Sequence, residues 1–461
     1  MRKIILFLVL ILSIIFFSII SLRYYHSSKA VAIKANLVID TKKILGPVFP
    51  NWKAIAQGGE EPGVRMFQNI IPQMTELKSR YIRLDHIYDF YNVVGGSSGN
   101  LVFDWKMLDA TICDILSTGA KPFLALTYMP TVISNNGTVI GRPKDWNDWA
   151  IIVQQTIERY SGMSSQLCDG RFTGVPDIYY EVWNEPDLEM FGKWSKSEYN
   201  TLYNYSSQGA SRAKNVYTFL LGGPAITSLY ENWIKTLLGY VDSNNLRFDF
   251  ISWHHYTTNP DDYTKDLVDL ESWLTELPLK YRNLPKVISE WDYDSSYNPK
   301  ADKDGGAAYT IASIRNLTSK GLELAFSFEV KDGPTPSWGI LTYTGEKKPR
   351  YYALKLLNIL QGLQLQIVGE GTFVQAISSF NPINNTVGLV LVNYDPQNTN
   401  IELVPVNFIN LTNGGYQLTM TYTNGEVVNF KDLVVTDGQL QRSILMQPNM
   451  VIGLELQKMS P

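Results

Sequence analysis

The chain has 461 residues, of which 45% are hydrophobic and 18% charged. This composition is that of an ordinary globular protein and excludes a largely disordered chain, and the length favours one large domain with a smaller one. The formal net charge is -4, and no run of Lys and Arg occurs after the N-terminus. Both features argue against a nucleic acid as partner.

The N-terminus predicts a membrane segment. Arg2 and Lys3 precede residues 4–22, which carry no charge, and Arg23 follows. About 20 apolar residues span a bilayer as a helix, whereas the apolar part of a signal peptide is usually shorter. We favour an uncleaved anchor over a cleaved signal, for which Ala30 and Ala32 offer a cleavage pattern. In either case residues 1–33 export the rest of the chain, to the cell surface or, after cleavage, into the medium.

The two cysteines, Cys113 and Cys168, have neither zinc-site spacing nor a CxxC pattern. We favour an unpaired Cys113, buried on an apolar helix. A disulfide to Cys168 is the alternative that an exported chain allows.

Residues 34–362 repeat a short β-branched or aromatic run, a polar loop and an amphipathic stretch. The eight predicted strands begin near residues 44, 81, 122, 177, 217, 248, 286 and 322. This rhythm predicts a (β/α)8 barrel. A doubly wound open sheet is the alternative, but the first strand is not followed by a Gly-rich phosphate turn.

Residues 363–461 change to a period of two, with short alternating strands separated by turn residues. Asn424-Gly425 is a strong hairpin signal. We therefore expect a small antiparallel β-sandwich that braces the barrel, since its strands show no exposed cluster of Trp.

Functional side chains of a (β/α)8 barrel lie at the carboxyl ends of its strands. Glu185 and Glu290 each directly end a predicted buried strand, where an unused acid is costly. The other candidates at strand ends are Arg83, Asp85, His86, Tyr128, Asn184, His254, Tyr256, Trp291, Phe328 and Glu329.

Two carboxyl groups that converge across a barrel mouth suit glycoside hydrolysis, because one must donate a proton while the other is ionised. Asn184 can hydrogen-bond a sugar hydroxyl, and stacking faces are expected from Trp183, Trp253, Trp291 and Trp338. The alternative is structural, with Glu185 simply paired to Arg83.

Metal and serine chemistry fit the sequence less well. His254 and His255 are adjacent in a strand, so their side chains point to opposite faces and cannot share one ion. A G-x-S-x-G nucleophile motif is absent from the sequence. We expect no metal and no cofactor.

"VWNEP" and, about a hundred residues later, "ISEW" resemble the retaining glycosidases of clan A. The segments "YIRLDHI", "KPFLALTYMP", His254-His255-Tyr256 and "WGILTYTGEKKPRYYALKLL" narrow the resemblance to glycoside hydrolase family 39, the β-xylosidases and α-L-iduronidases. It implies a glycoside or polysaccharide substrate, Glu185 as acid/base and Glu290 as nucleophile.

The resemblance also implies that Asn184 contacts the 2-hydroxyl and that His254 and Tyr256 orient nucleophile and substrate. The chain departs from the family pattern at Asp85 and His86, where histidine and glycine are usual. It departs again where Phe326 and Phe328 replace a tryptophan under the sugar. The identity of the sugar is therefore left open.

Two other functions compete with a surface glycosidase. One is a barrel that has lost activity and serves as a carbohydrate-binding or structural surface protein, which the intact Glu185 and Glu290 argue against. The other is an endo-acting hydrolase or transglycosidase of an exopolysaccharide, which an open groove would favour.

Overall fold

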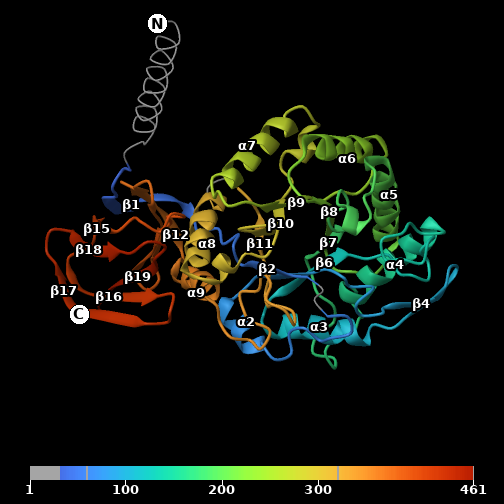
Figure 1. Ribbon diagram of the computed structural model, residues 1–461, viewed down its shortest axis with the longest axis horizontal. Coiled ribbons are helices and arrows are strands. Elements are labelled where there is room, and N and C mark those ends of the chain that lie inside the picture. Colours follow the sequence, from blue (N-terminus) through green and yellow to red (C-terminus); the bar gives the residue numbers. More distant parts are fainter. Residues whose placement is uncertain (1–31, 59–60, 319–320, 460–461) are drawn as a thin grey trace, which may run out of the picture.

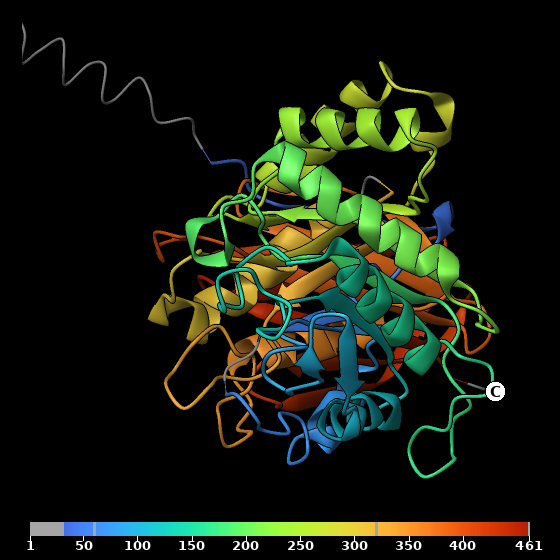
Figure 2. The ribbon, with the colours of Figure 1, turned by 90° about the vertical axis from the view of Figure 1, so that its right-hand side faces the viewer.

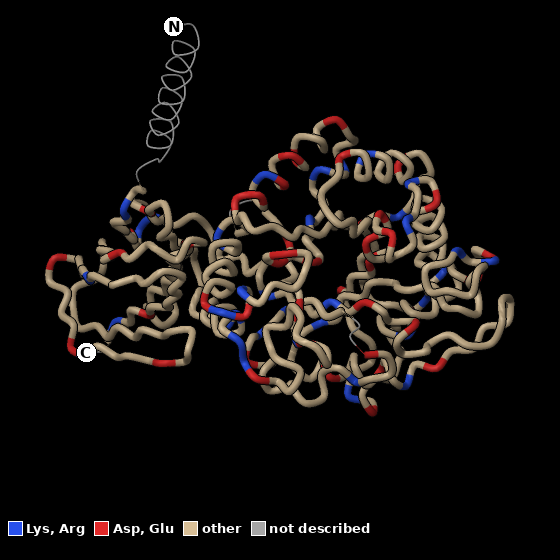
Figure 3. The backbone as a smooth tube through the Cα atoms, viewed as in Figure 1, with Lys and Arg blue, Asp and Glu red and all other residues tan. Residues whose placement is uncertain are grey.

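The computed structural model describes residues 32–58, 61–318 and 321–459. The predicted membrane segment, residues 4–22, lies outside the described residues and stays a prediction. In the part of the chain that the structure describes, none of the helices combines the length and apolar character that crossing a bilayer requires. Basic and acidic residues are interspersed along both halves of the molecule (Figure 3).

Eight parallel strands close into a barrel, as predicted. In order around the barrel they are β2 (Ala54–Gln57), β3 (Tyr81–Leu84), β6 (Lys121–Leu126), β7 (Ile178–Val182), β8 (Phe219–Ile226), β9 (Phe250–Tyr256), β10 (Lys286–Asp292) and β11 (Leu324–Phe328). Inward side chains such as Phe123, Phe250 and Phe326 fill the interior, so the barrel is a packed core and its mouth is left for function.

Helices surround this barrel (Figures 1 and 2). They are α2 (Ile71–Leu77), α3 (Lys106–Ser117), α4 (Trp146–Tyr160), α5 (Lys196–Arg212), α6 (Glu231–Ser243), α7 (Asp262–Leu274), α8 (Asp304–Leu317) and α9 (Pro349–Leu356). Sequence sets their starts: Asp145 caps α4, and Ser195 with Glu198 forms a capping box on α5. Short 3₁₀ turns occupy Glu189–Phe191, Leu279–Tyr281, Pro299–Asp302 and Leu357–Ile359, and a hairpin joins β4 (Val94–Ser97) to β5 (Asn100–Phe103).

A second sheet of nine strands lies beside the barrel (Figure 1). It holds β1 (Leu37–Pro47), β12 (Leu363–Val368), β13 (Val374–Asn381), β14 (Thr386–Asn393), β15 (Glu402–Ile409), β16 (Gly414–Tyr422), β17 (Val427–Val435), β18 (Leu440–Met446) and β19 (Val451–Lys458). Buried side chains from both ends of this sheet share one core. The predicted Asn424-Gly425 turn joins β16 to β17.

The predicted first barrel strand at Ile44 is wrong. That segment belongs to β1, which pairs antiparallel with β12 and parallel with β15, so the second sheet is not purely antiparallel. At its start β1 alternates between buried and less buried residues, with Leu37 and Ile39 inside, as in a sheet with one covered face. The barrel instead begins at β2, whose four residues are all buried.

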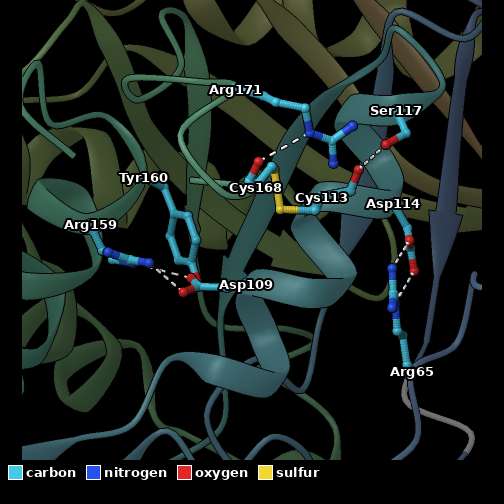
Figure 4. Close-up of a disulfide and its surroundings, with 9 residues drawn as sticks. All are labelled: Arg65, Asp109, Cys113, Asp114, Ser117, Arg159, Tyr160, Cys168 and Arg171. Atoms are coloured by element: carbon cyan, nitrogen blue, oxygen red, sulfur yellow. Dashed lines mark hydrogen bonds and ion pairs between the residues drawn. A yellow bond between two sulfur atoms is a disulfide. The ribbon is translucent and has the colours of Figure 1, made fainter. Parts of the chain in front are cut away.

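The favoured unpaired Cys113 is also wrong. Cys113 on α3 forms a disulfide with Cys168, in the connection from α4 to β7 (Figure 4), with Cα atoms 5.5 Å apart. Packing decides this pairing, since α3 and α4 are also joined by the Asp109–Arg159 ion pair. The disulfide fixes a loop far from α3 in sequence against that helix.

Candidate active site

Arg83 lies fully buried at the centre of the site. It donates from Nε to Glu181 Oε2 (2.8 Å), from Nη1 to Glu290 Oε1 (2.7 Å) and from Nη2 to Asn184 Oδ1 (2.7 Å). Burial disfavours the guanidinium charge, but Glu181 and Glu290 outweigh it and raise the pKa of Arg83. Its carboxylate partners are thus Glu181 and Glu290, not Glu185 as the structural alternative assumed.

Glu290 and Glu185 face each other from β10 and the end of β7. Tyr256 donates its hydroxyl to Glu290 Oε2 (2.7 Å), and His254 Nδ1 lies 2.9 Å from Glu185 Oε1 and 3.5 Å from Glu290 Oε2. One oxygen of each glutamate and a His254 nitrogen all lie within 4.8 Å of one another. The glutamate side chains keep 12% and 7% of their surface exposed, so both are within reach of solvent.

His254 is fully buried between these acids. Burial lowers its pKa, but the charges of Glu290 and Glu185 and the bond to Glu185 raise it above 6.5 overall. A proton on Nδ1 leaves that atom without a lone pair for a cation. These three residues are close enough to hold a metal ion, and a proton with a raised pKa on His254 would compete with a cation for the ring nitrogen.

The turn after β7 aims Glu185 into the mouth. Trp183 and Glu185 have positive φ angles of 71° and 43°, a conformation unusual for residues other than glycine. The Glu185 amide donates to the carbonyl of Ala225 (2.8 Å), and the Trp183 indole donates to the carbonyl of Phe191 (3.0 Å). Local sequence and neighbouring loops together hold the strained turn.

Asn184 and Tyr128 are joined to each other and, through Asn184, to Arg83. The Asn184 amide donates to the Tyr128 hydroxyl (2.9 Å) while its oxygen accepts from Arg83. His86 lies against the Tyr128 ring, with centroids 4.5 Å apart, and its Nδ1 contacts Asp89 Oδ2 at 2.8 Å. The structure therefore brings Tyr128 and His86 together at this side of the mouth.

Asp85 is only 5% exposed and follows β3 at the same mouth. Burial raises the pKa of Asp85 to about 6, although the positive charges of His86 and Arg83 oppose the shift. The negative charge of Glu290 adds to this rise. Burial raises the pKa of Tyr128, and the charge of Asp85 adds to that shift. Asp85 therefore lies near both residues.

The segment after β11 supplies Glu329 and Trp338. Glu329 is fully buried and accepts from Ser337 Oγ (2.7 Å) and Gln57 Nε2 (2.9 Å). Trp338 is partly buried and packs its ring against Phe328, 5.8 Å away, which in turn lies 6.3 Å from the Tyr256 ring. Phe326, by contrast, lies lower in the barrel interior.

The predicted stacking role of Trp291 is wrong. Its ring is fully buried outside the barrel, 5.8 Å from Tyr263 on α7 and 6.4 Å from Tyr309 on α8. Adjacent strand residues point to opposite faces, so Glu290 facing inward sends Trp291 outward. Trp183 and Trp253 are likewise fully buried. The same alternation separates His254 from His255, which contacts Asp266.

Glu181 is the residue that sequence reasoning missed. It lies within β7, fully buried, and faces Arg83 inside the barrel. The signal was present, since a lone acid inside the apolar run "IYYEV" requires a buried cation.

Comparisons with known proteins identify a family and a set of relatives. The model for the family described as Glycosyl hydrolases family 39 matches residues 37–406. A curated β-xylosidase of Caldicellulosiruptor saccharolyticus is 26% identical over 349 residues, 68% of this chain and 67% of that protein. A second, from Geobacillus stearothermophilus, is 26% identical over 58% of each chain.

Solved structures show the same fold. A family 39 enzyme from Xanthomonas axonopodis pv. citri is 19% identical with a TM-score of 0.75, over 94% of this chain and 99% of the other. A monomeric β-xylosidase from Caulobacter crescentus is 20% identical with a TM-score of 0.75, over 92% and 100% of the two chains. A bacterial orthologue of human α-L-iduronidase has a TM-score of 0.69 at 14% identity, over 93% of this chain and 84% of that one.

Proposed function

Because the chain belongs to family 39 of the glycosyl hydrolases, and is thus a glycosidase, we propose that it is a retaining enzyme acting on β-xyloside-like substrates. Glu290 is the proposed nucleophile and Glu185 the proposed acid/base. The curated relatives named β-xylosidases support this substrate class.

The distance between the two glutamates carries the proposal. Retaining glycosidases hold their carboxyl groups about 5–5.5 Å apart, whereas inverting enzymes leave about 6.5–9.5 Å for a water molecule. One oxygen of Glu185 and one of Glu290 lie within 4.8 Å of each other, and this close approach supports the shorter, retaining spacing.

In the first step a Glu290 oxygen attacks the anomeric carbon and the bond to the leaving oxygen breaks. Glu185 gives that oxygen its proton. Arg83 and Tyr256, each 2.7 Å from a different Glu290 oxygen, orient the nucleophile. In the second step Glu185 takes a proton from water, whose oxygen attacks the same carbon and releases Glu290.

The remaining predicted residues are assigned to the sugar. Asn184 contacts the 2-hydroxyl, and Asp85, His86, Tyr128, Glu329 and Trp338 surround the other ring positions. Trp338 is the tryptophan whose partial exposure supports a stacking role.

The proposed location is the cell surface, with residues 4–22 as anchor and both sheets outside. The Cys113–Cys168 disulfide supports an oxidising compartment. N-terminal sequencing of the protein from its native host tests the anchor. A chain that began near residue 31 or 33 would instead indicate a cleaved signal.

A screen of aryl glycosides tests the activity. We expect an aryl β-xyloside to be cleaved, with Glu290→Ala inactive on the same substrate. Proton NMR of the first product should show the anomeric configuration of the substrate. Inversion would overturn the retaining mechanism, and absence of cleavage across the screen would overturn the activity.

A further inference from the structure

Asp85 is a buried acid at the barrel mouth whose carboxyl oxygen Oδ1 has no hydrogen-bond partner among the described residues. It lies two residues after Arg83, so both side chains point to the barrel interior, with Asp85 nearer the mouth. Its carboxyl group lies within electrostatic reach of Arg83, His86 and Glu290, and Tyr128 senses its charge.

The Asp85 carboxyl group receives no hydrogen bond from the described residues. Its Oδ1 atom is buried and without a partner. The guanidinium of Arg83 is engaged elsewhere, since it donates to Glu181, Glu290 and Asn184. A buried carboxyl oxygen that lacks a donor costs free energy.

Asp292 on β10 shows what a structural carboxylate looks like in the same barrel. Asp292 is fully buried, and Arg350 donates to one of its oxygens (2.6 Å) and the Tyr293 amide to the other (2.5 Å). Two buried aspartates thus differ in their hydrogen bonding, and the one whose Oδ1 lacks a donor lies within electrostatic reach of Glu290. This contrast indicates that the donor for Asp85 comes from a bound molecule.

We propose that Asp85 is a specificity-determining residue that accepts a hydrogen bond from a ring hydroxyl of the sugar bound between Glu185 and Glu290. This inference rests on the proposed function. With Asn184 assigned to the 2-hydroxyl, the hydroxyl at C3 or C4 is the donor for Asp85. An ionised carboxylate only accepts, so a sugar without a hydroxyl at that carbon loses the bond.

The test combines deletion of the carboxyl group with deletion of the hydroxyl. Wild type, Asp85→Asn and Asp85→Ala are assayed on an aryl xyloside and its 3-deoxy and 4-deoxy forms, or on the corresponding set for the glycoside that the screen finds. A charge-assisted hydrogen bond corresponds to a loss on the order of 10- to 100-fold in kcat/KM. We expect Asp85→Ala to show this loss on the parent substrate and almost none on one deoxy form.

Asp292→Asn is the matched control, because it removes a buried carboxylate whose donors are Arg350 and the Tyr293 amide. Its effect on kcat/KM should be the same for the parent and both deoxy substrates. The proposal is overturned if Asp85→Ala lowers kcat/KM by the same factor on the parent and on both deoxy substrates, because the carboxyl group and the hydroxyl then act independently.

If the protein cleaves no glycoside in the screen, the proposed function fails, but the role of Asp85 can still be tested. Asp85 is then judged by calorimetric binding of xylose and its deoxy forms to wild type and Asp85→Ala. Coupling between the residue and one hydroxyl would still support the role of Asp85. Absence of coupling, or of binding altogether, would overturn it.

Discussion

Two buried arginines each hold a carboxylate of β10 by an ion pair. Arg83 holds Glu290 from inside, while Arg350 at the start of α9 holds Asp292, two residues further along. Arg350 also donates to Ser327 Oγ (3.0 Å) and to the carbonyls of Trp338 and Phe328. Both arginines are almost completely buried.

The difference lies in what the carboxylates can reach. Asp292 is 1% exposed and its partners are an arginine and a backbone amide. Glu290 keeps one side open toward Glu185, within 4.8 Å, and shares His254 with it. The same ion pair can therefore fasten the loop after β11 or aim a nucleophile, according to whether a second acid faces the carboxylate.

The largest expected effect is a difference in turnover between variants of Glu290 and of Asp292. Glu290→Gln should lower turnover on an aryl glycoside by on the order of 10⁴-fold or more, because the amide cannot form the glycosyl-enzyme. Asp292→Asn should lower the free energy of unfolding instead and leave a measurable turnover. Aryl glycoside assays and urea unfolding of both variants check this. The contrast fails if Asp292→Asn is the less active of the two.

Glu185→Ala should act selectively on the leaving group. Substrates with poor leaving groups need the proton and should lose about 10²- to 10⁴-fold, whereas activated aryl glycosides should keep their first step. Azide should restore the second step and yield a glycosyl azide of retained configuration. Equal losses across a leaving-group series would remove Glu185 from the acid/base role.

Arg350→Met should cost about 3–5 kcal/mol of unfolding free energy, because it leaves Asp292 buried without its ion-pair partner. Arg159→Met removes the partly exposed pair with Asp109, whose side chains are 27% and 20% exposed, and should cost about 1 kcal/mol or less. Chemical unfolding of both variants measures the difference. Similar losses of unfolding free energy in the two variants would mean that burial does not make the Arg350–Asp292 pair more important to stability than the Arg159–Asp109 pair.

An effect smaller than the loss of Arg350 is expected from Asp85, as a pH dependence of stability. Its pKa is about 6 in the folded chain against an ordinary value of 3.8, so the folded state binds the proton more tightly. The stabilisation is present below pH 4 and is lost as the pH rises through 6, by at most about 3 kcal/mol. Unfolding free energies of wild type and Asp85→Asn should run in parallel near pH 4, where Asp85 is protonated, and should separate as the pH rises through 6, because only wild type then loses stability. Curves that stay parallel throughout would contradict the shifted pKa.

Sequence alone was enough to predict which residues meet at the barrel mouth, because a parallel barrel places the carboxyl ends of all its strands there. Glu185, Glu290, His254 and Tyr256 were found in this way, and the family match confirms the resemblance drawn from "VWNEP" and "ISEW". The outward orientation of Trp291 was within reach of the sequence, because Trp291 directly follows the inward-facing Glu290 and adjacent strand residues point to opposite faces. The register shift of β10 lies before Glu290, between Ile288 and Glu290, and does not affect this pair.

Contacts between residues far apart in the chain could not be predicted from the sequence. The identity of β1 depended on whether its neighbours were β12 and β15 or the barrel, and a short β-branched run fits both. The Cys113–Cys168 disulfide and the Arg83 bonds to Glu181, Glu290 and Asn184 join residues 55 to 207 positions apart.

The sequence by itself determined the repeat that closes the barrel, the two strands that end in glutamate and the hairpin at Asn424-Gly425, because each depends on periodicity or local backbone preference. Tertiary structure alone decided that Arg83 holds Glu290 while His254 lies between the two acids. It also decided that Asp85 is buried without a donor. These features depend on which residues meet across the barrel, and burial then fixes their charges and free hydrogen-bonding capacity.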